Sequence, residues 1–328
     1  MRRPARATQR LLLGLVLALA PAVLIAPPAR AIETVIAGAV GSASANLWPV
    51  YVGINKGLFA AEDIQVDMIF SQSNNQVIQQ LTVDALNFSV GSGLVDPIRA
   101  IEKGAPLAIV RIDAQRPPYA LLAKPAIKSM KELKGKIVSV GGSKDITRIF
   151  FERMLAPSGI DAKDVDLIFA GATSARYSAL QSGAADAAIL TSPYNFHAET
   201  AGFTNLGLAS DFVDMPFSGM STNRNWAARN PATVRKFLAA YTRSIQWLAD
   251  PANRKEAIDL MVTVSKTKPE DVAKAYEFLV VGGFYETTGK LSRAKLGRVV
   301  EALQQLGDVP AGFAADRLFL PAVTQVID

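Results

Sequence analysis

The sequence predicts an α/β protein with two lobes, each built on a mainly parallel sheet flanked by helices. Half of its 328 residues are apolar, which is enough to bury a substantial core. Short apolar strands alternate with amphipathic helices, a pattern typical of parallel sheets. The same layout occurs twice along the chain before it gives way to helices after about residue 220.

The first 31 residues have the pattern of a secretory signal peptide. Residues 1–10 carry four arginines and no acid, residues 11–26 are uncharged and apolar, and Ala29-Arg30-Ala31 provides the small residues of a cleavage site. We therefore expect cleavage after Ala31 and a soluble periplasmic protein. A membrane anchor is the alternative, but an apolar run interrupted by Pro21 is shorter than the ~20 residues that span a bilayer.

Loss of this leader changes the charge balance. The formal net charge is +6, but five basic residues and no acids lie in the leader, which leaves 30 basic and 29 acidic residues and a net charge of +1. A nearly neutral chain gives no electrostatic reason to expect a nucleic acid or a membrane surface as partner.

The chain has no cysteine and one histidine, His197. This composition excludes disulfides and Cys/His nucleophilic catalysis, and it argues against a transition-metal site. His197 has no partner at catalytic spacing, so we expect it at the surface or beside the hinge. We predict a monomer with no catalytic residues, no metal and no cofactor.

The first half of the mature chain alternates strands and helices. Residues 64–70 alternate strictly between apolar and other positions, which indicates a half-buried strand. Lys56-Gly57 gives the preceding helix a basic last turn and a C-terminal glycine. We predict strands over residues 33–37, 64–70, 86–90 and 107–112, with helices over 48–55, 77–81 and 94–101.

Residues 133–193 are the most informative stretch. Strands are predicted over 136–140, 166–169 and 187–190, and each runs directly into a small polar loop. Two of these loops open a helix, where free backbone N–H groups favour an anion or a polar head group. Several such strand ends side by side form a binding crevice.

After about residue 220 the pattern becomes helical. Asn230-Pro231 is an N-cap followed by proline at the first helical position, and a stripe of apolar residues with a period of 3.6 follows it. Further helices are predicted over residues 253–262, 269–281 and 292–306.

Small polar residues at the predicted strand ends are the candidate ligand contacts. Neutral hydroxyls and bare N–H groups suit an oxyanion that must be captured and released. The alternative is that each hydroxyl only caps its own helix. The candidates are Ser42, Asn46, Ser71, Gly91, Ser92, Ser143, Thr147, Thr173, Thr191 and Ser192.

Two arginines and several aromatic residues extend this set. Arg148 and Arg176 stand in the first turns of two helices, where each either pairs with a carboxylate or sulfonate or is a solvated or salt-bridged side chain. Asp145 is interpreted as a helix cap rather than an amine ligand. Trp48, Tyr119 and Tyr194 offer an aromatic wall, with a core position as the alternative for Trp48.

Several short motifs carry a family resemblance that spans nearly the whole mature chain. They are Lys56-Gly57-Leu58-Phe59, the segment 100–107, Leu133-Lys134-Gly135-Lys136, the segment 179–188, and Asn230-Pro231 with 234–238. On these motifs the chain resembles the solute-binding proteins of ABC importers for nitrate, sulfonates and taurine. Thiamine-pyrimidine synthases belong to the same superfamily.

The resemblance implies a type II periplasmic binding fold. Lobe I would comprise residues 32–116 and 220–328, with the C-terminal helices packing on it, and lobe II would comprise 117–219. Two hinge strands are expected near 116–123 and 215–223, and the ligand would close the cleft between the lobes. The implied partner is an ABC permease in the inner membrane.

One departure from the family pattern concerns its Gly-x-x-Asp motif. Here Val83 and Asn87 stand in place of the glycine and the aspartate. These positions precede a predicted strand, so a structural role is expected for them. The departure indicates a distant subfamily, so the family's usual ligands are not carried over to this chain.

The leading hypothesis is thus a periplasmic receptor for a small organic anion or zwitterion, such as a sulfonate, a taurine-like compound, a carboxylate or a pyrimidine precursor. One alternative is an enzyme of the same fold, a pyrimidine synthase or a menaquinone-pathway lyase. The synthases use a cysteine-rich motif and an active-site histidine, whereas this chain has no cysteine and only the isolated His197. The other alternative is a soluble sensor component.

Overall fold

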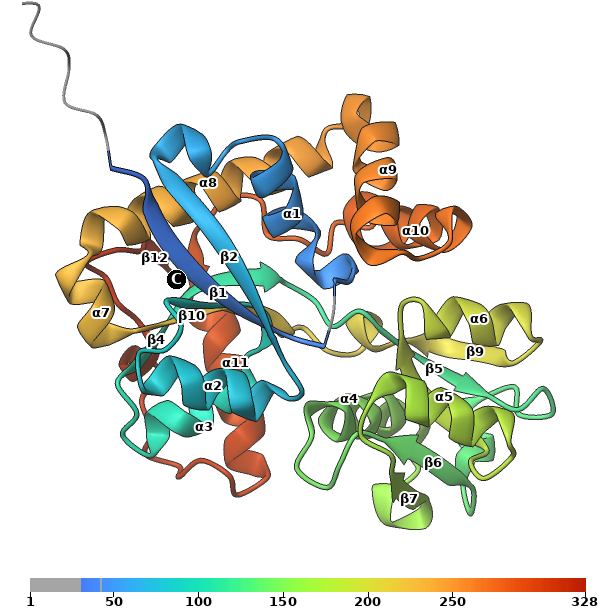
Figure 1. Cartoon of the computed structure of the whole chain (residues 1–328). Coiled ribbons are helices and arrows are strands. Elements are labelled where there is room, and N and C mark those ends of the chain that lie inside the picture. The colour runs from blue at the N-terminus through green and yellow to red at the C-terminus, as the bar shows by residue number, and fades with distance from the viewer. Residues whose placement is uncertain (1–30, 42) are drawn as a thin grey trace, which may run out of the picture. The chain divides into compact units, whose positions relative to one another are not determined.

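Two five-stranded sheets organise residues 32–328 (Figure 1). The computed structural model describes residues 31–41 and 43–328, so the predicted leader before Ala31 and the candidate Ser42 lie outside the described residues. Within the described part of the chain, no helix combines the length and apolar character needed to cross a membrane.

The first sheet has the strand order β2-β1-β3-β10-β4. Strands β1 and β2 are parallel and in register from Glu33 opposite Ile64 to Val40 opposite Ser71, whereas β10 is antiparallel to both of its neighbours. The strands are β1 (Glu33–Val40), β2 (Ile64–Ser71), β3 (Phe88–Gly93), β4 (Leu107–Ala114) and β10 (Ser218–Asn223).

The second sheet has the order β7-β6-β8-β5-β9. Strand β6 is parallel to β7 and β8, and β5 is antiparallel to β8 and β9. The strands are β5 (Tyr119–Ala123), β6 (Ile137–Val140), β7 (Asp166–Phe169), β8 (Ala187–Thr191) and β9 (Thr204–Leu208). A short third sheet pairs β11 (Leu291–Ser292) with β12 (Val326–Ile327).

Both large sheets share one plan, in which a single antiparallel strand occupies the fourth position. The chain passes from the first sheet to the second between Ala114 and Tyr119, and it returns between Leu208 and Ser218. The predicted α/β class with two mainly parallel sheets is therefore confirmed. The lobe boundaries at 116/117 and 219/220 stay a prediction; below, "first lobe" and "second lobe" mean each sheet with the helices that pack on it.

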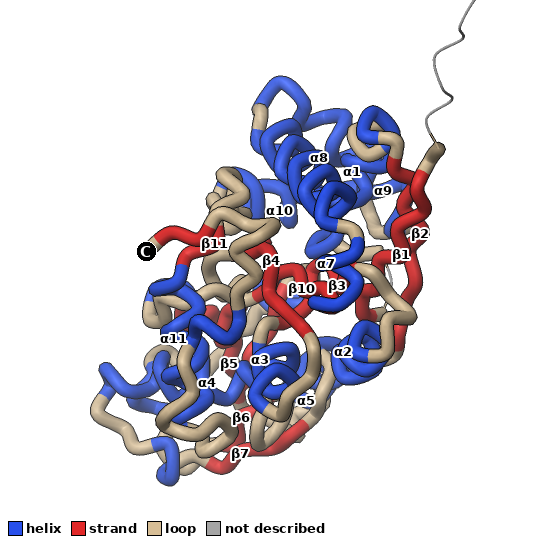
Figure 2. Tube along the Cα trace, turned by 90° about the vertical axis from the view of Figure 1, so that its left-hand side faces the viewer, coloured by secondary structure: helices blue, strands red, loops and turns tan. Residues whose placement is uncertain are grey.

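Helices flank both sheets (Figure 2). α4, α5 and α6 contact the second sheet. α2, α3 and α7 contact strands of the first sheet, and α1, α8, α9, α10 and α11 pack on other helices of the first lobe. Their bounds are α1 Trp48–Asn55, α2 Asn74–Thr82, α3 Val95–Glu102, α4 Ile146–Leu155, α5 Thr173–Gln181, α6 Tyr194–Thr200, α7 Arg224–Arg229, α8 Pro231–Ala249, α9 Arg254–Ser265, α10 Pro269–Tyr276 and α11 Arg293–Gln305.

The long helix α8 shows how the C-terminal helices join the first lobe, as expected. Its predicted apolar stripe is buried, and Phe237 at the centre of the stripe stacks on Phe88 of β3 and on Phe59. The ring centroids are 4.3 Å and 4.8 Å apart, respectively. Tight aromatic stacking of this kind ties the helix to the sheet.

Two elements differ from the sequence-based expectation. The helix predicted over 269–281 is α-helical only to Tyr276 and continues as a π-helical turn, Glu277–Val281. Strand β9 is not predicted from the sequence, because its only apolar residues are Leu206 and Leu208 on either side of Gly207. It forms by pairing with the buried strand β5.

Asn87 has the structural role expected for it. Its Oδ1 accepts the backbone N–H of Ile36 in β1 at 2.7 Å. In the second lobe, Asp186 occupies the matching place before β8, and its Oδ2 accepts the backbone N–H of Ile137 in β6 at 3.0 Å. Amide and carboxylate thus provide the same acceptor, which explains why the replacement leaves the sheet intact.

Candidate ligand-binding site

A cavity of about 320 Å³ lies where the two lobes meet, and we call it the central cavity. Its lining comes from the end of β3, the beginnings of α4 and α5, and the segments around Asn46 and Phe217. The volume falls at the lower end of the range for small-molecule sites. Of the predicted contacts, those that line it are Asn46, Gly91, Ser92, Tyr119, Thr147, Thr173 and Arg176.

Arg176 is a buried cation in the wall of this cavity, with 3% of its surface exposed. Its Nε donates to the carbonyl of Ile189 at 2.7 Å, and Nη2 donates to Thr173 Oγ1 at 2.7 Å. A third hydrogen bond runs from Nη1 to the carbonyl of Gly171. These bonds use three of the five guanidinium N–H groups. No carboxylate forms an ion pair with Arg176 among the residues that the structure describes.

Tyr119 and Phe217 form an aromatic wall beside the guanidinium. Their rings meet edge to face with centroids 5.2 Å apart, and the Arg176 guanidinium lies 5.9 Å from the centre of the Tyr119 ring. Burial raises the pKa of the Tyr119 hydroxyl, with the charge of Arg176 acting in the opposite direction. The phenol therefore stays neutral and can offer a hydrogen bond to a ligand.

The first-lobe side of the cavity is fixed by Gly91. Its backbone has φ +59°, and its N–H donates to Asp113 Oδ2 at 3.3 Å. Asp113 is 1% exposed, and burial raises its pKa to about 6 despite the opposing charge of Arg111, whose Nε lies 3.2 Å from Asp113 Oδ1. A buried charge pair thus underlies the loop that bears Ser92.

The polar side chains at the start of α4 form hydrogen bonds that cap this helix. Asp145 Oδ1 accepts the backbone N–H of Thr147 at 2.8 Å and also the Thr147 hydroxyl. That hydroxyl in turn accepts the N–H of Gly141 at 2.8 Å. Asp145 therefore is the helix cap that the sequence indicated, although both side chains also line the cavity.

Several predicted contacts lie elsewhere. Trp48 is fully buried in the first lobe, its indole N–H donates to the carbonyl of Ala257 at 2.9 Å, and its position is the core alternative. Ser71 donates to Gln80 at 3.0 Å. Arg148 pairs with Glu152 at 2.7 Å and bonds the carbonyl of the exposed Ser143. These residues do not line the central cavity, and neither does Thr191, which is half-buried at the end of β8.

Ser192 and Tyr194 line a second cavity, of about 250 Å³, opposite residues 43–45 and the α9–α10 segment. Beside it, His197 of α6 does have a partner, because its Nε2 lies 3.0 Å from Asp271 Oδ2 of α10. Phe196 and Phe278 meet edge to face next to this pair, with centroids 5.7 Å apart. The two lobes are therefore in direct contact on this flank.

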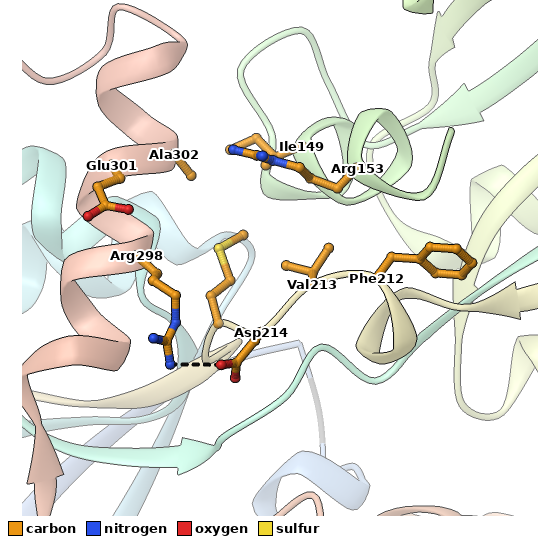
Figure 3. Close-up of a pocket in the computed structure, with 9 residues that line it drawn as sticks. Ile149, Arg153, Phe212, Val213, Asp214, Arg298, Glu301 and Ala302 are labelled. Atoms are coloured by element: carbon orange, nitrogen blue, oxygen red, sulfur yellow. Dashed lines mark ion pairs between the residues drawn. The ribbon is translucent and has the colours of Figure 1, made fainter. Parts of the chain in front are cut away.

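A third cavity, of about 210 Å³, lies between α4 and α11 (Figure 3). Ile149 and Arg153 of α4 face Arg298, Glu301 and Ala302 of α11 across it, with residues 212–215 alongside.

Asn74, Asp96, Arg99 and Phe217 are among the residues of the central cavity that the sequence did not single out as contacts. Phe217 lies in the predicted hinge segment 215–223, so the sequence indicates that it is near the lobe boundary. Nothing in the sequence indicates that its ring lines the cavity. Asp96 and Arg99 stand one helical turn apart and form an ion pair at 3.3 Å. That spacing is normally read as a solvated helix face.

Comparisons with known proteins agree with this architecture. The family model described as "NMT1/THI5 like" matches residues 44–254. The chain is 28% identical over 220 residues, 65% of its length, to the riboflavin-binding protein RibY of Chloroflexus aurantiacus, and the match spans 61% of that protein.

Two solved structures show the same fold. The alkanesulfonate-binding protein SsuA from Xanthomonas axonopodis pv. citri, bound to MOPS, superposes with a TM-score of 0.69 at 16% identity and covers 90% of this chain and 98% of its own. The periplasmic nitrate-binding protein NrtA from Synechocystis PCC 6803 has a TM-score of 0.68 at 14% identity, over 88% of this chain and 84% of its own.

Proposed function

Because this chain belongs to the NMT1/THI5-like family, we propose that it is the solute-binding component of an ABC importer and that it holds a small organic anion in the central cavity. It would act in the periplasm as a monomer, after cleavage behind Ala31, and deliver its ligand to an inner-membrane permease. The sulfonate- and nitrate-binding proteins of the same fold support a binding role.

The buried side chain of Arg176 is the observation that supports an anionic ligand. Removing a cation from water costs several kcal/mol unless an anion compensates it. Arg176 is buried, and its hydrogen-bond partners in the described structure, including the Tyr119 hydroxyl, are all neutral oxygens. A carboxylate or sulfonate in the cavity would supply the compensating anion and accept a charge-assisted hydrogen bond from the guanidinium.

The aromatic wall supports an organic rather than an inorganic anion. Tyr119 and Phe217 present ring surfaces beside the guanidinium. An anionic group bound at Arg176 would place the ligand's apolar or aromatic part against these rings. The similarity to a riboflavin-binding protein makes a ring-bearing ligand a necessary part of any screen.

The test is a thermal-shift screen of the purified protein, with native mass spectrometry to detect any co-purified ligand. The panel contains alkanesulfonates, taurine, nitrate, aromatic carboxylates and riboflavin, with neutral sugars and divalent metals as controls. A ligand at a hundred times its dissociation constant adds about 2.7 kcal/mol, which corresponds to a rise of about 4 °C for a chain of this length. If only a neutral sugar or a metal stabilises the protein, the proposal is wrong.

Two outcomes would redirect the assignment. Recovery of a chemically altered compound after incubation would favour an enzyme of this fold. Loss of a transcriptional response, with solute uptake intact, on deletion of the gene would favour a sensor component.

A further inference from the structure

Three charged side chains meet at one edge of the central cavity. Lys144 Nζ lies 2.8 Å from Asp308 Oδ1, and Arg99 Nε lies 3.2 Å from Asp308 Oδ2. The Arg99 guanidinium also donates to the backbone carbonyl of Lys144. The Asp308 carboxylate thus pairs with both Lys144 and Arg99. Arg99 is also hydrogen-bonded to the loop that carries Lys144.

These three residues come from different lobes. Arg99 lies on α3 and Asp308 follows α11, and these helices pack together in the first lobe. Lys144 belongs to the loop between β6 and α4 of the second lobe. Arg99 lines the central cavity, as does Asp145, the neighbour of Lys144. The cluster therefore joins the two lobes at the rim of the proposed ligand site.

Asp308 is the centre of the cluster and is almost completely enclosed. Only 4% of its side chain is exposed, against 24% for Arg99 and 71% for Lys144. Burial acts to raise the pKa of Asp308, but the hydrogen bonds and charges of Lys144 and Arg99 lower it overall. The carboxylate therefore stays ionised, and separating the lobes would remove one of its two cations.

The same flank carries a second polar contact between the lobes. Arg153 of α4 donates to Gln305 of α11, three residues before Asp308. The two helices run along the cavity drawn in Figure 3. Gln305 and Asp308 both lie beyond residues 44–254, the part of the chain that the family model covers. The C-terminal segment therefore supplies the first-lobe acceptors of both contacts.

We propose that Asp308, with Lys144 and Arg99, is a latch that holds the lobes shut over the ligand and so sets the rate at which the ligand leaves. The inference rests on the proposed function and concerns the regulation of the same site. The affinity of a closing receptor is reduced by the fraction of time it spends open. Asp308 is accordingly a positioning residue: it does not line the central cavity, and its loss should weaken the binding of every ligand by the same factor.

The first test is the dissociation rate of the best anion from the screen, measured by stopped flow. Asp308→Asn is expected to raise this rate about tenfold, within the usual range for coupling between sites, with little change in the association rate. Lys144→Met, at an exposed position, carries the same prediction if Asp308→Asn fails to fold. The matched control is Glu62→Gln, which breaks the 2.7 Å pair with Arg243 inside the first lobe and should leave both rates unchanged.

The second test needs no ligand. The chain contains no cysteine, so Lys103→Cys at the end of α3 and Lys163→Cys in the second lobe give two unique labelling sites. The distance between spin labels at these sites should lengthen or broaden in ligand-free protein when Asp308→Asn is added.

The outcomes separate the two proposals. Unchanged distances and an unchanged dissociation rate, in a protein that binds the anion, would overturn the latch and leave the proposed function standing. Changed distances in a protein that binds no anion of the panel would support the latch and contradict the proposed ligand class.

Discussion

Gly91 is the residue at which the wall of the central cavity is most tightly constrained, so its replacement by alanine is the sharpest test of that wall. A Cβ at this position would lie 2.9 Å from Leu47 Cδ2 and 3.1 Å from the backbone oxygen of Asn46. Its φ of +59° is also a conformation that residues with a Cβ avoid. Both penalties act on a segment that lines the cavity.

Two separate penalties lower the stability of the alanine variant. The left-handed conformation costs alanine about 1–2 kcal/mol. Inserting a methyl group into a packed site costs about 1–3 kcal/mol more, because the backbone of Asn46 cannot rotate away as a flexible side chain would. We therefore expect Gly91→Ala to lower the free energy of unfolding by about 2–5 kcal/mol, and to weaken ligand binding by displacing Asn46.

Gly57→Ala is the matched control. Gly57 has φ +68°, but a Cβ there would meet nothing within 4 Å. Urea unfolding of both variants, with calorimetric titration of the ligand, separates strain from contact. Gly57→Ala should lose only the conformational part, about 1–2 kcal/mol, and keep its affinity. Equal losses of stability and affinity in the two variants would refute this account of the cavity wall.

Two further predictions concern buried polar groups. The pKa of Asp113 is about 6 in the folded chain against 3.8 ordinarily. The folded protein therefore binds this proton more tightly, and its free energy of unfolding falls by about 2 kcal/mol as pH rises from 4 to 6.5. Asp113→Asn should flatten that part of the pH profile, and an unchanged slope would contradict the assignment. Asn87→Ala removes the acceptor for the N–H of Ile36 and should cost about 1–3 kcal/mol in urea unfolding. Asn87→Asp, which copies Asp186, should cost much less; equal costs would disprove the acceptor role.

Much of the fold could be predicted because local patterns decide it. The strict alternation over 64–70 and the Asn230-Pro231 cap mark β2 and α8 almost to the residue. Strand β9 could not be predicted because its extended conformation depends on pairing with β5, and nothing in a short segment that contains Gly207 indicates this pairing.

The candidate site was predictable in kind but not residue by residue. Arg148 and Arg176 occupy similar places in the first turns of α4 and α5. Arg148 has Glu152 four residues on, the spacing of a surface pair, and the structure shows that pair at 2.7 Å. Arg176 has no acid three or four residues away in either direction. That difference was a usable signal for which arginine is buried.

Contacts between distant segments gave no such signal. Asp308 pairs with Lys144, 164 residues away in the sequence, and Asp271 pairs with His197, 74 residues away. The sequence around Trp48 fits a binding wall and a core position equally well. The core position becomes evident only from the hydrogen bond of its indole N–H to the carbonyl of Ala257. Tertiary packing, rather than local preference, selects these partners.

Arg176 is proposed to bind the anionic group of the ligand, and a double-mutant cycle tests this contact. The dissociation constants of an anionic ligand and its neutral amide isostere are measured for the wild type and for Arg176→Met, with Arg148→Met as the control. Removing one partner of a buried charge pair costs about 2–5 kcal/mol, so the wild type and Arg148→Met should prefer the anion by about 30-fold or more. That preference should collapse in Arg176→Met, and its survival there would contradict the claim.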